Sequence, residues 1–417
     1  LAKAVDAATD GATIYVMSNL TMTSCARFYS KSLTITSLGD ATCTITRGDN
    51  FDRQQDNARS TYNPAMIEVQ TTGDVGAGLT LTNIIFDDAG KKEGTVFAQA
   101  VSDGSIDNKT CVQDAIIASN ATVPTTITLG DGAVLRNFGG MSAVRVTDQA
   151  KLVMKSGSVI EDASSITRSK GDAGSVGPAG AVWLQGSDFE MENGAEIKNV
   201  NGRAVYADGG SVSVGGTISG IIGNPAMWQG KDGTAIHLRG SAKATLNGKI
   251  SDCTEGVLVF VDKAVFEMAA GSFLGNSDAD GIKTNEDPLN WSLVNKDDYG
   301  TDRNIITING EITGIQNSKH PNQFKHPIQF KYGTLTIGES GYVHDNVANY
   351  GALYIQRDAV VHIYGKINNN VSAGRGGALG MPGHGFVTLY MYPGAEMKNN
   401  RSARTGGGAS LNTCKFI

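Results

Sequence analysis

The sequence has little of what marks several common protein classes. Of its 417 residues only 18% are charged, 7% are aromatic and nine are proline. No run is long and apolar enough to cross a bilayer as a helix. Helical spacing of apolar residues is clear only in the first eight residues. These shortages disfavour a helical fold, and no membrane insertion is expected for this chain.

Cysteine and basic residues are also arranged without a pattern that indicates a partner. The five cysteines form no Cys-x-x-Cys pair, so a zinc site is not indicated. Cys25 and Cys43 lie about one repeat apart and could pair or stack, or they could be buried thiols. The net charge of −6 is spread without a basic stripe, which argues against a nucleic-acid partner.

Glycine, in contrast, is abundant, with 53 residues, and it punctuates a recurring unit. The unit reads small residue, apolar, variable, apolar, variable, and then Gly, Asn or Asp. Copies recur at a base interval of about twenty-odd residues, which indicates a stacked solenoid. The copies begin at Ala143, Ala181, Ala204, Ala235, Gly256, Gly281, Pro327, Ala352 and Ala378.

Each copy is followed by a second alternating run, a glycine and a third short run. Three short strands per coil, with Gly and Asn at the sharp corners, predict an all-β, right-handed, single-stranded parallel β-helix of the pectin-lyase-like kind. A leucine-rich repeat is the main rival, but its Leu-Asn consensus and helical half-repeat are missing.

A single domain over residues 1–417 is expected because a solenoid grows along one axis. Residues 1–10 are predicted to form a capping helix that covers the first coil. Insertions are predicted near 221–233, 286–303 and 313–326, and they hold Trp228, Trp291 and the basic stretch 319–326. The last copy breaks off after Gly408, so the chain is interpreted as a fragment of a larger surface protein that carries further partner domains or a chaperone.

The second and fourth positions of each first strand are predicted to face the core, and the third and fifth to face solvent. Aromatic rings interleaved with amide and charged groups along such a column are suited to a sugar. An ordinary solvated β-face, where aromatics occur by strand propensity, is the alternative. The predicted substrate-binding residues are Trp183, Tyr206, Asp208, His237, Arg239, Lys283, Asn285, Gln329, Lys331 and Tyr354.

The densest acidic segment, 276–287, supplies the candidates for chemistry. Alignment of neighbouring coils places Glu255 beside Asp280 and Asp262 beside Asp287. A close carboxylate pair is what glycoside hydrolysis requires, and a separation of about 5–5.5 Å favours retention of configuration. Solvated aspartates at β-helix turns are the alternative interpretation.

With Asp280 and Asp287 seven residues apart on a β-helix, this segment resembles the β-helical lacto-N-biosidase family of gut bacteria. The resemblance implies a retaining glycosidase that releases lacto-N-biose from human milk oligosaccharides with two aspartates. Asp280 and Asp287 would then be acid/base and nucleophile, in an order that stays open. Seven residues of straight strand span about 23 Å, so a corner must curl the two carboxylates together.

Two weaker patterns occur near the end of the chain. Gly383-His384-Gly385 with Asp297 and Asp298 suggests polygalacturonases, but no Arg-Ile-Lys follows, and this reading is rejected. Asp297, Asp298 and Asp302 would suit a structural calcium ion, although a solvated acidic loop is favoured. No metal or other cofactor is expected to be required.

The sequence thus favours an extracellular, secreted or cell-surface retaining glycosidase that acts on β-linked N-acetylated oligosaccharides of milk or mucin. The first alternative is a non-catalytic β-helical adhesin or glycan-binding passenger. The second is a polysaccharide lyase that uses Lys283, His237 or Arg239 next to acidic sugars.

Overall fold

The structure, a computed structural model, describes residues 1–48, 51, 65–88, 115–140, 142–165, 180–223, 233–284, 304–316, 325–381 and 385–417. The chain divides into two compact units, Leu1–Ile221 and Ile222–Ile417. A single continuous domain stays a prediction. The predicted site residues Asn285 and Asp287 lie outside the described residues.

The first unit begins with one short helix and continues as strands. Its elements are α1 (Ala2–Ala7), β1 (Thr13–Val16), β2 (Leu20–Met22), β3 (Ala26–Tyr29), β4 (Ser32–Ser37), β5 (Cys43–Arg47), β6 (Ile67–Gln70), β7 (Ala77–Thr82), β8 (Ile84–Asp87), β9 (Ile116–Leu129), β10 (Ala133–Arg136), β11 (Gly139–Gly140), β12 (Val144–Met154), β13 (Val159–Glu161), β14 (Ser164–Ser165), β15 (Val182–Gln185), β16 (Asp188–Met191), β17 (Glu196–Lys198), β18 (Arg203–Asp208), β19 (Ser211–Val214) and β20 (Thr217–Ser219).

The second unit consists of strands alone in its described part. Its elements are β21 (Thr234–Arg239), β22 (Lys243–Leu246), β23 (Lys249–Ser251), β24 (Thr254–Asp262), β25 (Val265–Met268), β26 (Phe273–Thr284), β27 (Asn304–Ile308), β28 (Glu311–Ile315), β29 (Ile328–Ile337), β30 (Tyr342–His344), β31 (Val347–Ala348), β32 (Leu353–Ile363), β33 (Lys366–Asn368), β34 (Val371–Ser372), β35 (Leu379–Gly380), β36 (Val387–Met391), β37 (Arg401–Ser402), β38 (Ala409–Ser410) and β39 (Cys414–Phe416).

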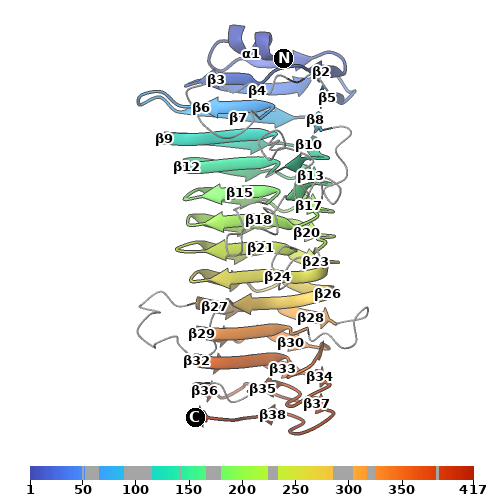
Figure 1. Ribbon diagram of the computed structural model, residues 1–417, viewed down its shortest axis with the longest axis vertical. Helices are drawn as coiled ribbons and strands as arrows, with labels where there is room; N and C mark the ends of the chain where they lie inside the picture. The colour runs from blue at the N-terminus through green and yellow to red at the C-terminus, as the bar shows by residue number, and fades with distance from the viewer. Residues whose placement is uncertain are drawn as a thin grey trace, which may run out of the picture. The chain divides into compact units, whose positions relative to one another are not determined.

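Within each unit, strands of successive coils pair in parallel, and the chain winds as a parallel β-helix (Figure 1). In the first unit one ladder runs β2–β5–β8–β10–β13–β17–β20. In the second unit a ladder runs β24–β26–β29–β32–β35–β38. The predicted fold class is confirmed, although several first and second runs join into one long strand. These long strands bend at left-handed residues such as Asp148 in β12 and Tyr332 in β29.

The core is made by the side chains predicted to face inward. All sixteen second and fourth positions from Val144 to Ile355 are at most 2% exposed. Full burial of an aliphatic side chain contributes about 1.5–3 kcal/mol relative to its exposed state, so these columns are the main source of stability. Asparagine and aspartate occupy left-handed corners, among them Asn199, Asp252 and Asn369, as their tolerance of this backbone predicts.

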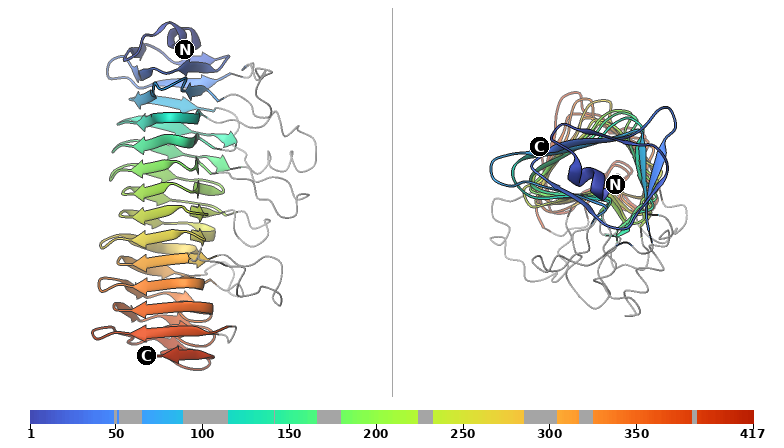
Figure 2. Two further views of the ribbon diagram at one scale, coloured as in Figure 1. Left: turned by 90° about the vertical axis from the view of Figure 1, so that its left-hand side faces the viewer. Right: turned by 90° about the horizontal axis from the view of Figure 1, so that it is seen from above.

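The predicted capping helix is confirmed as α1, which lies over the end of the first coil when the chain is viewed from above (Figure 2). Val5 is fully buried. The Lys31 ammonium donates to the carbonyl oxygens of Val5 and Ala8, each at 2.8 Å. A cation at the C-terminal end of a helix satisfies carbonyls that have no partner within the helix. In the part of the chain that the structure describes, no helix is long and apolar enough to cross a membrane.

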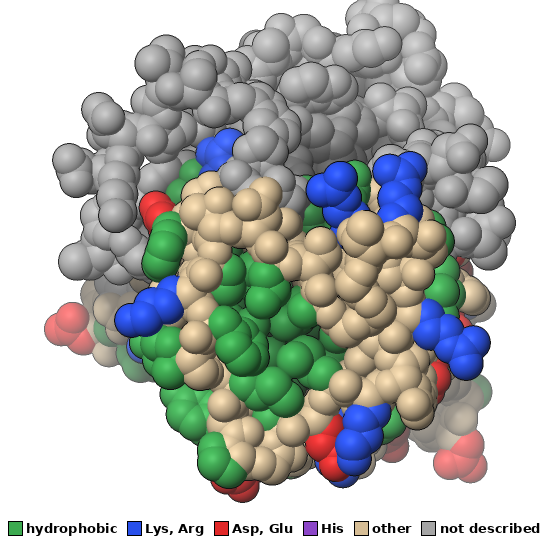
Figure 3. All heavy atoms as spheres, turned by 90° about the horizontal axis from the view of Figure 1, so that it is seen from below, with side chains coloured by type: hydrophobic (Ala, Val, Ile, Leu, Met, Phe, Trp, Pro, Cys, Tyr) green, Lys and Arg blue, Asp and Glu red, His purple; other side chains and the backbone are tan. Residues whose placement is uncertain are grey.

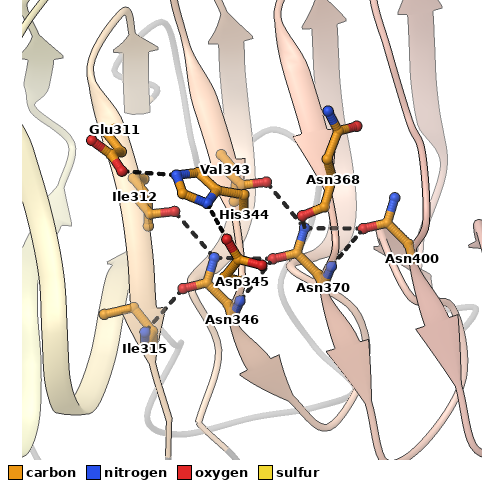
Figure 4. A network of polar contacts seen from close by, with 10 residues as sticks. All are labelled: Glu311, Ile312, Ile315, Val343, His344, Asp345, Asn346, Asn368, Asn370 and Asn400. Carbon is orange, nitrogen blue, oxygen red and sulfur yellow. Dashed lines mark hydrogen bonds and ion pairs between the residues drawn. The ribbon is translucent and has the colours of Figure 1, made fainter.

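A buried asparagine ladder ties three coils of the second unit together (Figure 4). The Asn346 amide donates to the Asn370 side-chain oxygen, and the Asn370 amide donates to that of Asn400, both at 3.0 Å. The side-chain oxygens of the ladder also accept backbone N–H groups, and Asn346 Oδ1 accepts that of Ile315 at 3.0 Å. Asn346 and Asn370 are fully buried, so their polar groups are satisfied only while the rungs keep this register.

Candidate functional site

The predicted outward column of the first unit has the expected register but not the expected exposure. Arg145, Trp183 and Tyr206 occupy equivalent positions in β12, β15 and β18. Trp183 is 7% exposed and Tyr206 is 2% exposed, so their predicted exposure to solvent is wrong. The Arg145 guanidinium lies 5.0 Å from the Trp183 ring centroid. Because rungs are about 4.8 Å apart, large side chains cover one another along a column, and an outward direction does not guarantee contact with water.

The neighbouring position at the end of these strands is open to solvent. Asp208 ends β18, aligns with Gln185 of β15, and both residues are exposed. Asp208 is therefore placed as predicted, at the edge of a column whose larger members are buried.

In the second unit the equivalent column contains His237, Phe260, Lys283, Gln329 and Tyr354, aligned rung by rung. His237 is 5% exposed and Gln329 is 6% exposed, which again contradicts their predicted exposure. The reason is similar, because the His237 and Phe260 rings lie 4.8 Å apart and cover each other. Lys283 and Tyr354 are half-buried.

A second column runs beside it, two residues further along each strand. Arg239 is exposed and pairs with Asp262 at 3.7 Å. Lys331 was predicted to face solvent but is 8% exposed. Its backbone is fixed on both sides, since its N–H donates to Thr284 Oγ1 at 2.8 Å and its carbonyl accepts from that hydroxyl at 3.2 Å. Next to it, the Gln356 amide donates to the Tyr354 hydroxyl at 2.7 Å.

Asp280 lies in β26, at the point where this strand approaches the start of β29. Its Oδ1 accepts the backbone N–H of His326 at 2.7 Å, and Asp280 is 9% exposed. Gly281 permits this approach, because a Cβ there would lie 2.2 Å from the Pro327 carbonyl oxygen. Among the described residues no donor bonds Oδ2 of Asp280. One carboxylate oxygen of Asp280 is thus used to hold the backbone of His326.

The His326 ring begins a cluster of three stacked rings. It lies 4.6 Å from the Tyr354 ring at an interplanar angle of 10°, and 6.5 Å from the Tyr350 ring. The two tyrosine rings are 5.5 Å apart. Asp280, His326, Tyr350 and Tyr354 are called the Asp280 site below. It combines a carboxylate with aromatic surface, which is the chemistry that a pyranose ring requires.

The predicted acid pair Glu255–Asp280 is wrong in register. Asp278 pairs with Thr254, but Asp280 pairs with Val257, so three residues of β24 lie opposite two residues of β26. Glu255 falls within this bulge, and Val257, two residues later, is the partner of Asp280. On the other side of β24 the predicted alignment is also off by two residues, because Phe260, rather than Leu258, pairs with His237.

Several predicted features fall outside the described residues and are not tested. They are Asn285, Glu286, Asp287, Trp228, Trp291, Asp297, Asp298, Asp302 and His384. The insertion predicted over 313–326 begins later than expected, because residues 313–315 complete strand β28. Among the side chains that the structure describes, no three His, Cys, Asp or Glu are grouped so as to hold a metal ion.

The sequence did not identify the His326–Tyr350 part of the site. Tyr350 precedes the repeat unit that begins at Ala352, and His326 is the last residue of a stretch interpreted as an insertion. The available signal was the pair of tyrosines four residues apart, Tyr350 and Tyr354. A second polar cluster was also missed. His344 contacts Glu311 at 2.8 Å and Asp345 at 2.6 Å (Figure 4).

The cysteines seen in the structure are free thiols. Cys25 and Cys43 do not pair, and Cys43 is buried with its Sγ 3.4 Å from the Val16 carbonyl oxygen. Burial, followed by the Glu68 carboxylate, raises the pKa of the Cys25 thiol to about 12. The interpretation as a buried thiol is therefore confirmed for Cys43, whereas Cys25 is half-buried.

No family model matches the chain, and no curated protein matches it. Among solved structures, the crystal structure of endo-xylogalacturonan hydrolase from Aspergillus tubingensis is similar, with 13% identity and a TM-score of 0.29 over 98% of this chain and 83% of that chain. A hyper-glycosylated TibA fragment is 10% identical, with a TM-score of 0.22 over 95% of this chain and 100% of that chain. Similarity this distant carries no argument about function. The resemblance to lacto-N-biosidases stays a prediction.

Proposed function

We propose that this chain is an extracellular retaining glycoside hydrolase that acts on β-linked N-acetylated oligosaccharides, with the Asp280 site as the centre of its substrate-binding face. The observation that carries the proposal is the Asp280 carboxylate bonded to the backbone of His326, whose ring stacks with those of Tyr350 and Tyr354. Aromatic rings offer apolar faces to the C–H groups of a sugar, and a carboxylate bonds its hydroxyls. Gln329 and Gln356 add amide groups in the adjoining columns.

Retaining hydrolysis needs a second carboxylate about 5–5.5 Å from the first. Asp287 is the proposed partner of Asp280. One carboxylate attacks the anomeric carbon while the other, as a carboxylic acid, protonates the departing glycosidic oxygen. The second group then removes a proton from water, which attacks the glycosyl–enzyme ester and restores both groups. No cofactor takes part in these steps.

Hydrolysis of lacto-N-tetraose and of β-linked N-acetylated aryl glycosides tests the proposal. Asp280→Asn keeps an oxygen that accepts the His326 N–H, so the fold should persist while turnover falls by about 10³-fold or more. Asp252→Asn is the matched control, because Asp252 is exposed in the same unit. Asp287→Asn should behave as Asp280→Asn does. Equal turnover in all three variants and the unmodified chain would remove both aspartates from the mechanism.

A non-catalytic glycan-binding protein is the second candidate. It is favoured by the structural use of Asp280, whose Oδ1 already holds the His326 backbone. In that case the oligosaccharide binds, no product forms, and Asp280→Asn leaves affinity almost unchanged.

A polysaccharide lyase is less favoured by the contacts of its proposed residues. His237 packs against Phe260, and Arg239 pairs with Asp262. A lyase would release an unsaturated sugar that absorbs ultraviolet light, whereas a hydrolase would not.

A further inference from the structure

The end of the second unit has a charge that differs from that of the whole chain. From Val371 onward five residues are Lys or Arg, and Glu396 is the only acid, in a chain whose net charge is −6. Glu396 is already paired with Lys398 at 2.9 Å. Viewed from below, Lys and Arg side chains surround an apolar middle (Figure 3). This end of the unit therefore carries a local excess of positive charge.

Three exposed arginines, Arg375, Arg401 and Arg404, lie on two successive turns of this region. The Arg404 N–H donates to the Gly374 carbonyl at 3.1 Å, directly before Arg375. The backbone of Arg375 forms an isolated parallel β-bridge with the backbone of Thr405. The three are called the arginine corner below. Among the described residues no carboxylate forms an ion pair with any of the three guanidinium groups.

The turns that carry these arginines are rigid. Ser402 Oγ donates to the Gly374 carbonyl at 2.6 Å and to the Thr405 carbonyl at 3.1 Å. Gly376 has φ 70°, and a Cβ there would lie 1.9 Å from the Leu379 carbonyl oxygen. Arg401 lies opposite Val371 and Arg375 lies opposite Thr405, so the three side chains start from hydrogen-bonded backbone positions on two adjacent rungs.

We propose that the arginine corner binds the acidic groups of a polysaccharide, either carboxylate or sulfate. A guanidinium presents a planar fork of N–H donors that matches both groups with paired hydrogen bonds. Arg375 on one rung and Arg401 and Arg404 on the next present these forks to a polymer that crosses both rungs. This binding surface is separate from the Asp280 site and does not require hydrolysis.

Two other polyanions fit less well. Proteins that bind nucleic acid through phosphates typically contact about 6–10 of them, and a polybasic membrane segment has about 4–8 basic residues. Three arginines are fewer basic groups than either partner requires. A chain of net charge −6 also does not attract a polyanion over long range. A polymer with one acidic group per sugar needs only the local contacts that the arginine corner supplies.

Calorimetric titration with polygalacturonate and with heparin oligosaccharides tests this surface, with dextran as the neutral polymer. Combining Arg375→Gln, Arg401→Gln and Arg404→Gln should weaken binding of the acidic polymer about tenfold or more, since three charged hydrogen-bond donors are lost. Combining Lys151→Gln, Lys155→Gln and Lys198→Gln is the matched control. It removes the same charge from lysines that pair with glutamates in the first unit.

The expected result is loss of binding in the arginine variant alone, with thermal unfolding unchanged in both variants. Equal loss in both would show a non-specific charge effect and overturn the proposal. So would unchanged binding in the arginine variant, or equally tight binding of duplex DNA or phosphatidylserine vesicles. Asp280→Asn leaves this binding intact, so failure of the hydrolase proposal is distinguishable from failure of this one.

Discussion

At the scale of single residues, the Asp280 carboxylate has two possible tasks, because its two oxygens have different surroundings. Oδ1 accepts the His326 N–H at 2.7 Å and so fixes the ring that stacks on Tyr354. The same contact therefore positions a carboxylate and an aromatic surface next to each other. A sugar bound here would meet both without rearrangement of the backbone, which lowers the entropy cost of binding.

Tyr350→Ala is expected to raise KM more than it lowers kcat. The ring supplies aromatic surface at the edge of the site, and an aromatic contact contributes about 0.5–1.5 kcal/mol, equivalent to roughly a 3–10-fold change in KM. Tyr390→Ala is the control, because Tyr390 stacks on His362 in another cluster. Steady-state kinetics on the same glycoside measure both variants. A fall in kcat with KM unchanged would place Tyr350 outside substrate binding.

Cys25 should react slowly with alkylating agents at pH 8. Burial and the Glu68 carboxylate raise the pKa of its thiol from 9.0 to about 12, so little thiolate exists in the folded protein. The unfolded chain should be alkylated about 10³-fold faster at this residue by peptide mass spectrometry. The folded state also holds a proton that the unfolded state loses above pH 9. The free energy of unfolding is therefore expected to fall as pH rises from about 9 toward 12. Rapid alkylation of the folded protein at Cys25 would contradict this pKa.

At the scale of elements, polar contacts between rungs fix the register that apolar columns leave free. The asparagine ladder of the second unit is fully buried at Asn346 and Asn370. A slip of one residue would break every bond of the ladder and also turn the core side chains outward. Hydrophobic burial thus supplies most of the stability, and the amides select one alignment.

Asn370→Ala is expected to destabilise the second unit by about 2–3 kcal/mol. The change removes the acceptor that the Asn346 side-chain amide and backbone N–H share, and the side-chain donor to the backbone carbonyl of Val343. Asn412→Ala, at an exposed position, should change stability by less than about 0.5 kcal/mol. Urea denaturation of both variants measures the difference. Equal stability would show that the ladder does not contribute.

Lys31→Met is expected to loosen the N-terminal cap, at a cost of about 1 kcal/mol. The Lys31 ammonium bonds the carbonyl oxygens of Val5 and Ala8 at the end of α1, and a methionine cannot replace those bonds. Hydrogen exchange at β1 and β4 should accelerate. Lys3→Met, on the exposed side of α1, is the matched control and should leave exchange unchanged. Similar exchange in the two variants would exclude the ammonium as a cap.

At the scale of the whole molecule, periodicity predicted the fold and the core but not the environment of the outer columns. Inward positions such as Val182 and Leu184 followed directly from alternation, because a strand has only two faces. Trp183 lies on the opposite face and is still buried, since alternation gives the direction of a side chain and not what covers it. The register of Asp280 failed for a different reason. The repeat unit of β24 was placed two residues too early, since Val259 aligns with both Ile236 and Ile282. A shift of two residues preserves the alternation of inward and outward side chains, so the sequence period does not reveal it.

The most direct test of the central claim is a crystal structure of the Asp280→Asn variant with lacto-N-tetraose bound. We expect the sugar beside the side chain at position 280, with a pyranose ring against Tyr350 and an anomeric carbon within reach of a carboxylate. Sugar bound only at another column of the outer face, while the Asp280 site stays empty at saturating concentration, would contradict the account.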